Sequence, residues 1–153
     1  MANYPTLNFP PVHLRARRGS NSRTEVFDTV RGRWLVLTPE EWVRQHVVAW
    51  LMDSYALLPV QIIIEYPVEI NGTHQRADVV VVDKSGAPLL VVECKEADID
   101  FSREDVLSEV YAQAVRYNAT IHAPQIMITN GLRHFCFRTD DFCSYQPTRE
   151  LVF

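Results

Sequence analysis

Residues 76–95 read RADVVVVDKSGAPLLVVECK, and this stretch decides the fold class. Two runs rich in valine and leucine, residues 76–82 and 89–95, flank a polar segment that contains glycine and proline. Such a pattern is typical of a β-hairpin. The valines at 79–82 are apolar on both faces of a strand. They therefore predict a strand in the centre of a sheet that is covered on both sides.

A helix is predicted before the hairpin. Thr38 is a natural N-cap, Pro39 suits the first helical position, and Glu41 completes a capping box. Apolar residues then recur at helical spacing to about Tyr55. A second helix is predicted after the hairpin, capped by Ser102 and ending near residue 118.

Strand patterns surround these helices and complete the expected architecture. The chain thus predicts an α/β sandwich, with a mixed central sheet flanked by two main helices. The remaining strands are expected at residues 26–30, 34–37, 62–70 (residues 62–64 and 66–70 as one strand that ends at the Asn71-Gly72 turn), 125–129 and 134–138.

The composition is that of one globular domain. The chain has 153 residues, of which 47% are hydrophobic and 22% charged, enough to bury a core. No apolar run approaches the roughly 20 residues that a membrane span needs, and the first residues lack the pattern of a secretion signal. The three cysteines show no CxxC spacing, which argues against a disulfide framework or a zinc site. We therefore expect a soluble, cytoplasmic protein.

Charge is distributed unevenly along the chain. Residues 1–38 hold six arginines against two acids, a net charge of +4, whereas the remainder holds nine basic and seventeen acidic residues, a net charge of −8. We interpret residues 1–25 as a basic, extended leader, because prolines block a helix there, and residues 26–153 as a single domain. The basic segment could grip a polyanion. The simpler interpretation, which we prefer, is a poorly ordered leader.

Three polar side chains interrupt the core strands of the hairpin. If the hairpin is symmetric about the Ser85–Gly86 bond, Asp83 faces Pro88 and Asp78 lies opposite Glu93, with Cβ atoms roughly 5 Å apart. Lys95 then returns to the face of Glu93 by strand alternation.

This trio has the composition of a hydrolytic metal site. Two neighbouring buried carboxylates need a proton or a cation, and Asp78 and Glu93 suit Mg²⁺ or Mn²⁺, with the backbone carbonyl of Cys94 as a further ligand. Lys95 could orient the attacking water and stabilise charge on phosphorus. The plainer alternative is a structural ion pair between Asp78 and Lys95, with Glu93 in water at a strand end.

Two observations favour the metal site over the ion pair. The chain has only two lysines, and one of them stands at the required offset. Gln113 and Tyr117 also lie at i, i+4 on the apolar stripe of the second helix, where polar groups need partners.

With these residues the chain resembles the PD-(D/E)xK nuclease superfamily, including its accessory QxxxY motif. More closely, it resembles the N-terminal nuclease domain of type I restriction enzyme R subunits, over about residues 26–139. The matching words are Asp78, LTPEEWVRQ at 37–45, VECKE at 92–96, QAVRY at 113–117, Asn118 and ITNG at 128–131.

The resemblance implies a sandwich like that of restriction endonucleases and a role for each matched residue. Asp78 and Glu93 would be metal ligands for Mg²⁺ or Mn²⁺, and Lys95 would be the catalytic lysine. Gln113 and Tyr117 would position DNA or the active-site loop. Glu41 matches an acid that some relatives place near the metal, although its capping box explains it equally well.

The implied function is restriction-type endonuclease action on DNA, with restriction-modification subunits as partners. No GxxxxGK[ST] loop occurs in these residues, so no motor is expected within them. The main alternative is a catalytically inactive nuclease-fold module that binds DNA or protein. A third hypothesis, an enzyme with Cys94 as nucleophile, lacks a base nearby in the sequence.

Overall fold

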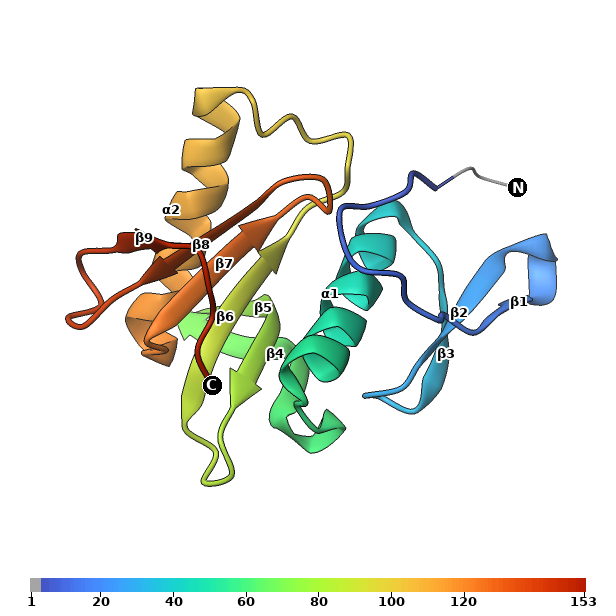
Figure 1. The fold of residues 1–153 in the computed structure, drawn as a ribbon, viewed down its shortest axis with the longest axis horizontal. Coiled ribbons are helices and arrows are strands. Elements are labelled where there is room, and N and C mark those ends of the chain that lie inside the picture. Colours follow the sequence, from blue (N-terminus) through green and yellow to red (C-terminus); the bar gives the residue numbers. More distant parts are fainter. Residues whose placement is uncertain (1–3) are drawn as a thin grey trace.

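Two long helices enclose a mixed sheet in the computed structural model, which describes residues 4–153 (Figure 1). Within these residues a six-stranded sheet has the order β4-β5-β6-β7-β8-β9, and a separate three-stranded sheet has the order β1-β2-β3. Strands β6 and β7 are parallel, and the other neighbours in the larger sheet are antiparallel. The predicted α/β architecture is confirmed.

In chain order, the elements are β1 (Ala16–Arg18), η1 (Ser20–Ser22), β2 (Thr24–Asp28), β3 (Arg33–Val36), α1 (Pro39–Tyr55), η2 (Pro59–Gln61), β4 (Ile62–Ile70), β5 (Thr73–Val82), β6 (Pro88–Cys94), α2 (Glu104–Ile121), β7 (Gln125–Thr129), β8 (His134–Arg138) and β9 (Gln146–Thr148).

The two helices cover opposite faces of the six-stranded sheet (Figure 1). Val79 and Val81 of β5 belong to the apolar cluster that contains Val47 of α1. Val80 belongs to the second cluster, with Ala114 of α2. All five side chains are fully buried, and burial stabilises the fold by about 1.5–3 kcal/mol for each valine. The prediction of a central strand covered on both sides is therefore confirmed.

The start of α1 follows the sequence prediction. Its bounds, Pro39–Tyr55, coincide with the predicted helix, and the hydroxyl of Thr38 accepts a hydrogen bond from the backbone N–H of Glu41 at 3.1 Å. This cap satisfies one of the free N–H groups of the first turn.

The start of α2 corrects the sequence prediction. The helix begins at Glu104 after Arg103 and has no side-chain cap. Ser102 does not cap it, because its hydroxyl donates instead to the carboxylate of Asp100 at 2.6 Å, inside the preceding turn. The helix also runs to Ile121, beyond the predicted end.

The register of the central hairpin is confirmed in the strands and wrong at the turn. Val79 pairs with Val92, as the symmetric hairpin requires. At the turn, however, the partner of Pro88 is Val82, whereas the symmetric hairpin predicted Asp83. Asp83 has turned into the loop, where its carboxylate accepts hydrogen bonds from two backbone N–H groups and a hydroxyl. A bulge between the strands absorbs the shift.

Two short strands were not expected from the sequence. Strand β9 extends the larger sheet beside β8. Strand β1 is formed by Ala16–Arg18, in the basic segment for which poor order was preferred, and it pairs with β2. That preference is therefore wrong for these residues.

The N-terminal segment is also attached to the sandwich. Leu7 is buried against Gly131, whose φ of 85° lies in the left-handed region that favours glycine. Residues 1–3 of the predicted leader lie outside the described residues, and the boundary at residue 25 stays a prediction.

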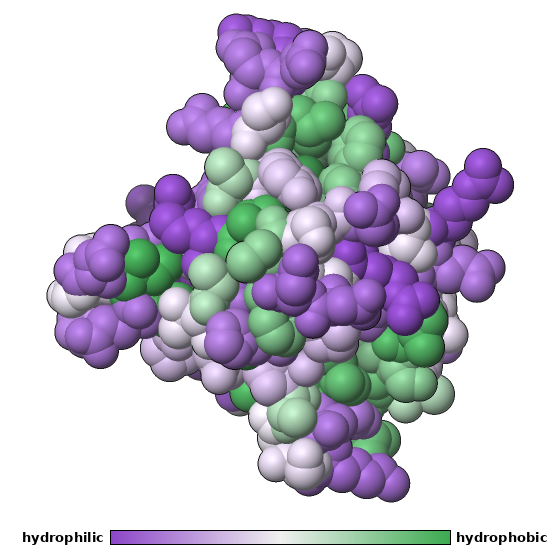
Figure 2. Space-filling view, turned by 90° about the vertical axis from the view of Figure 1, so that its left-hand side faces the viewer, coloured by the Kyte–Doolittle hydropathy of each residue, from purple (hydrophilic) through white to green (hydrophobic). Residues whose placement is uncertain are grey.

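The surface over α2, β8 and β9 carries small hydrophobic patches separated by hydrophilic residues (Figure 2). Neither long helix within residues 4–153 combines the length and the hydropathy of a membrane span.

Candidate active site

Asp78 and Glu93 lie side by side at the point where β5 and β6 separate. The last paired residues are Val79 and Val92, so Asp78 and Glu93 form the next position of the ladder. There the Oδ2 atom of Asp78 accepts a hydrogen bond from the backbone N–H of Cys94 at 2.7 Å. A side-chain carboxylate thus takes the place of a backbone carbonyl, which fixes Asp78 against β6.

A local distortion of the sheet turns Asp78 toward α1. The residue across from it on β4 is Glu65, whose φ of 56° lies in the left-handed region. Such a conformation costs on the order of 1 kcal/mol in a residue other than glycine. At the same place β5 loses its alternation, because Ala77 and Val80 both pack toward α2 while Val79 packs toward α1.

Glu93 is a buried acid with an unsatisfied oxygen. The residue is 3% exposed, and its Oε2 atom has no hydrogen-bond partner among the described residues. Burial, and then the neighbouring carboxylate of Asp78, raises the pKa of Glu93 well above its ordinary value. Without a cation, the carboxyl group is therefore expected to hold a proton at neutral pH.

Lys95 is held by α2 through the predicted QxxxY motif. Its Nζ atom donates to Oε1 of Gln113 at 3.1 Å, and Nε2 of Gln113 donates to the hydroxyl of Tyr117 at 3.0 Å. The backbone N–H of Lys95 donates to the carbonyl of Thr129 on β7 at 2.8 Å. The lysine is therefore positioned from both its backbone and its side chain.

Arg44 of α1 is a site residue that sequence reasoning missed. Its guanidinium lies 3.5 Å from Oδ1 of Asp78, 3.1 Å from Glu40 and 3.1 Å from Glu41. The arginine side chain is only 8% exposed. The charge of Arg44 offsets part of the rise in the pKa of Glu40. The sequence offered one indication of this role, because Arg44 is a charged residue on the apolar face of a helix. Gln113 was noticed for the same kind of reason, as a polar residue on an apolar stripe.

Glu41 is engaged in a different network. Its Oε1 atom accepts hydrogen bonds from Arg31 at 2.8 Å and Gln45 at 3.0 Å, and its Oε2 atom pairs with Arg44. The carboxylate therefore does not turn back to complete the predicted capping box. Its three partners give it a structural role in joining α1 to the turn after β2.

Glu40 is the acid of α1 that acts on the carboxylate pair. Its side chain is 46% exposed, and its pKa is raised by burial and then by the charge of Asp78. The charge of Glu40 also raises the pKa of Glu93. Glu40 and Arg44 stand at i, i+4 on one face of the helix. Glu41 stands at i, i+3 from the same arginine, so this spacing alone does not choose between the two acids.

A comparison with known protein families places this chain. A family model described as the type I restriction enzyme R protein N terminus (HSDR_N) matches residues 39–151. The chain belongs to this family. No curated protein matches the chain. The R protein N-terminal match contains the whole candidate site from Glu40 to Tyr117, but residues 4–38, with the three-stranded sheet, lie outside it.

The site of this R protein N-terminal domain is not a ready-made protein cage for a metal. Within residues 4–153, no three His, Cys, Asp or Glu side chains converge as such a cage. Two carboxylates with a backbone carbonyl nevertheless suit Mg²⁺, which usually keeps several waters and substrate oxygens. The unsatisfied Oε2 atom of Glu93 fits this ion as an available ligand.

Cys94 does not fit the role of nucleophile. Its side chain is fully buried in the cluster beneath α1, and burial raises the pKa of the thiol well above its ordinary value. A reactive cysteine needs an accessible thiolate. The backbone carbonyl of Cys94 stays a predicted metal ligand.

Glu93→Gln is expected to change how stability depends on pH. A folded-state pKa above the unfolded value means that stability is complete below about pH 4.5 and is lost as the pH rises toward the folded pKa. Glutamine imitates the neutral acid, so the variant should gain on the wild type by up to about 1.4 kcal/mol per pH unit above that point. Urea unfolding in EDTA across this range measures the difference. Parallel curves for the two proteins, as expected for the exposed control Glu69→Gln, would contradict the assignment of a buried neutral acid.

Proposed function

We propose that this domain hydrolyses phosphodiester bonds of DNA, as a restriction-type endonuclease that uses Mg²⁺ or Mn²⁺. The observation that carries the proposal is the unsatisfied oxygen of buried Glu93 beside Asp78, with Lys95 held next to them by Gln113. Membership of the restriction enzyme family supports a nuclease context.

The ligands of the metal would be the carboxylates of Asp78 and Glu93 and the carbonyl of Cys94. Glu40 takes the place that the sequence prediction gave to Glu41, because its partly exposed carboxylate neighbours this pair. When bound, a divalent ion polarises the phosphate and lowers the pKa of a bound water.

Lys95 supplies the positive charge on the substrate side of the site. An ammonium group held by Gln113 can orient a water for attack or stabilise the extra charge on the phosphate oxygens in the transition state. Tyr117 holds the amide of Gln113 in turn. Positioning matters here, because preorganised donors lose little free energy to reorganisation during the reaction.

Arg44 contacts the carboxylate pair from α1, whereas Lys95 is held by α2. Its guanidinium lies 3.5 Å from Oδ1 of Asp78 and partly offsets the negative charge of the site. A cation would compete there with the proton that Glu93 is expected to hold.

The proposed partners follow from the family. DNA is the substrate, and restriction-modification subunits would supply target recognition and any motor, since no GxxxxGK[ST] loop occurs in these residues. The cytoplasm is the proposed compartment, because the three cysteines of the described chain are free thiols.

A nicking assay on supercoiled plasmid DNA tests the proposal. We expect conversion to nicked or linear DNA with Mg²⁺ or Mn²⁺ and none with EDTA, and calorimetry should detect binding of the same ions. A protein that binds neither ion and leaves the plasmid intact is instead the inactive module that binds DNA or protein.

Gln113→Ala is expected to lower cleavage about 10- to 100-fold, because Lys95 loses the acceptor that positions it. The change in the free energy of unfolding should stay near 1 kcal/mol, since the freed groups lie at a partly exposed rim. Initial cleavage rates and urea unfolding provide the two measurements. The exposed residue Gln146 offers a matched control as Gln146→Ala. Equal cleavage by Gln113→Ala and this control would remove Gln113 from the site.

A further inference from the structure

The three-stranded sheet is the part of the molecule that the family does not account for. Strands β1, β2 and β3 stand on the side of α1 away from the six-stranded sheet (Figure 1), outside the range 39–151 that the family model matches. A role for this sheet has to be sought in its own residues.

Its charge is opposite to that of the rest of the chain. Residues 1–38 carry a net charge of +4, whereas residues 39–153 carry −8. An acidic body repels the phosphate backbone of DNA. A nuclease with such a body needs a separate basic surface to hold its substrate, and the N-terminal sheet is where arginines are concentrated.

A cavity on this sheet gathers three arginines. Its volume is about 610 Å³, and Arg17, Arg18 and Arg23 line it without any acidic side chain among the lining residues. All three arginines are exposed. Arg18 and Arg23 form no ion pair within the described chain, and Arg17 pairs with Glu25 at 2.7 Å. Two guanidinium groups are thus available for an anionic ligand.

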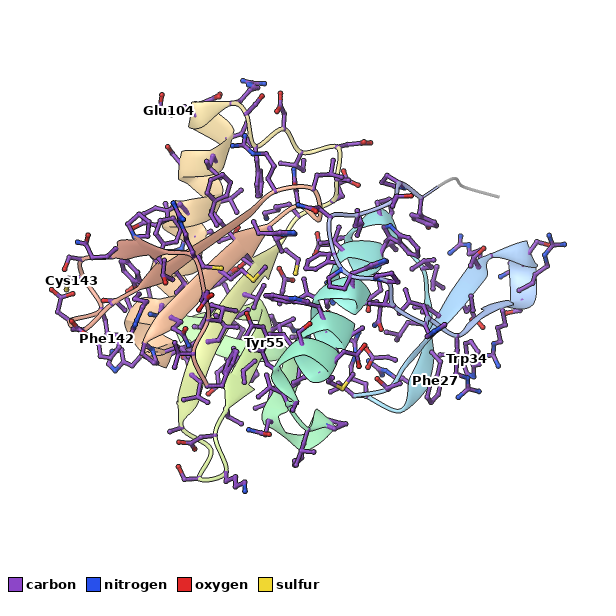
Figure 3. All side chains as sticks on the ribbon, viewed as in Figure 1. Phe27, Trp34, Tyr55, Glu104, Phe142 and Cys143 are labelled. Atoms are coloured by element: carbon purple, nitrogen blue, oxygen red, sulfur yellow. The ribbon has the colours of Figure 1, made fainter. Side chains whose placement is uncertain are left out.

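Aromatic rings support the neighbouring arginines. The guanidinium of Arg17 lies 4.1 Å from the centre of the Trp34 ring, and that of Arg15 lies 4.7 Å from Phe27. Trp34 and Phe27 lie next to each other on the sheet (Figure 3). Stacking holds the planar group while its N–H edge remains free to bind a phosphate. Arg15 and Arg17 are therefore partly preorganised, on the face of the sheet that carries Trp34. Arg18, the next residue of β1, points to the opposite face by strand alternation.

The cavity is continuous with the first turn of α1. Val36 and Leu37 line it, and the chain then passes directly into the turn that carries Glu40, the neighbour of Asp78. Arg31, in the turn between β2 and β3, also contacts Glu41 of that helix. The sheet is thus fixed to the helix that bears one side of the candidate site.

We propose that this cavity binds the phosphate backbone of duplex DNA on the flank of the cleaved phosphate. We call it the groove, and Arg17, Arg18 and Arg23 are its basic lining residues. The proposal rests on the proposed nuclease function for its choice of DNA. The groove would contribute affinity without sequence preference, since phosphate contacts are the same for every base pair.

Binding of a short fluorescent DNA duplex in EDTA tests the groove independently of cleavage. We expect R17Q/R18Q/R23Q to weaken binding about 10-fold or more at moderate salt, and to reduce the slope of log affinity against log salt by roughly 2–3. The control R103Q/R116Q/R149Q removes three exposed arginines elsewhere, with the same change in net charge. It should have a smaller effect on both quantities.

A second variant protects the test against loss of structure. R18Q/R23Q leaves the contacts of Arg17 with Glu25 and Trp34 intact and should still weaken binding severalfold. Equal effects of the two triple variants, absence of duplex binding by the wild type, or tighter binding of an RNA duplex would each overturn the proposal. If the groove variant loses binding while the wild type binds DNA but cleaves none, the groove stands and the proposed nuclease function fails.

Discussion

Lys95→Ala is expected to lower the rate of DNA cleavage by about 100- to 1,000-fold while metal and DNA still bind. The loss follows from removing a positioned charge that acts on the transition state. Asp78 and Glu93 keep their carboxylates in this variant, so the metal site remains. Removing a nearby positive charge should even strengthen cation binding slightly. Single-turnover cleavage at saturating DNA, with calorimetry of Mn²⁺ binding, measures the two effects separately.

The chain contains a matched control for this experiment. Lys84 is its only other lysine and lies exposed in the loop of the same hairpin. Lys84→Ala should cleave at the wild-type rate. If both lysine variants cleave like the wild type, Lys95 has no catalytic role and the proposed mechanism is wrong.

The second large effect is expected at the carboxylates. Asp78→Asn and Glu93→Gln should each abolish detectable binding of Mn²⁺ and reduce cleavage to background, because neutral amides are poor ligands for a hard cation. Calorimetry and plasmid nicking provide the measurements. Asp140→Asn, at an exposed position in the loop after β8, is a control of equal charge. Normal metal binding by either of the two site variants would remove that residue from the metal site.

These two variants should differ in stability, which distinguishes their roles. Glu93→Gln removes a carboxyl group whose charge is disfavoured by burial, so the metal-free protein should be at least as stable as the wild type. Asp78→Asn takes away the negative partner of Arg44, a side chain that is 8% exposed. Breaking a buried pair on one side costs about 3–5 kcal/mol, although the remaining contacts of Arg44 with Glu40 and Glu41 should reduce this loss. Urea unfolding in EDTA separates the two cases.

Local sequence determined the frame of the molecule. The start of α1 follows from a proline and a threonine cap, and β7 and β8 begin and end at their predicted residues. The pairing of Val79 with Val92 follows from hairpin symmetry, and it brings Asp78 beside Glu93. These features depend on neighbours close in sequence, so periodicity and turn chemistry are sufficient to find them.

The QxxxY motif was also readable before the structure. Gln113 and Tyr117 stand one helical turn apart on an apolar stripe, where an amide must find a polar partner. The structure supplies that partner as Lys95, which directly follows β6 and lies 18 residues earlier in the chain.

Only the tertiary structure decided which acid of α1 neighbours the site. Glu40 and Glu41 are adjacent in sequence but point about 100° apart around a helix. Arg31 and Gln45 occupy the carboxylate of Glu41, which leaves Glu40 beside Asp78. The choice depends on a turn of the N-terminal sheet, and no local pattern on the helix records it.

The basic N-terminal segment is a second feature whose structure depends on contacts that no local sequence pattern reveals. Its composition predicted an extended leader, but pairing of Ala16 with Val26 and the burial of Leu7 against Gly131 depend on residues far along the chain. Net charge and proline content describe a segment by itself and contain no information about such contacts. The sequence by itself therefore determined the helices, the hairpin and the carboxylate pair, whereas long-range packing decided where the arginines lie and which charges surround the site.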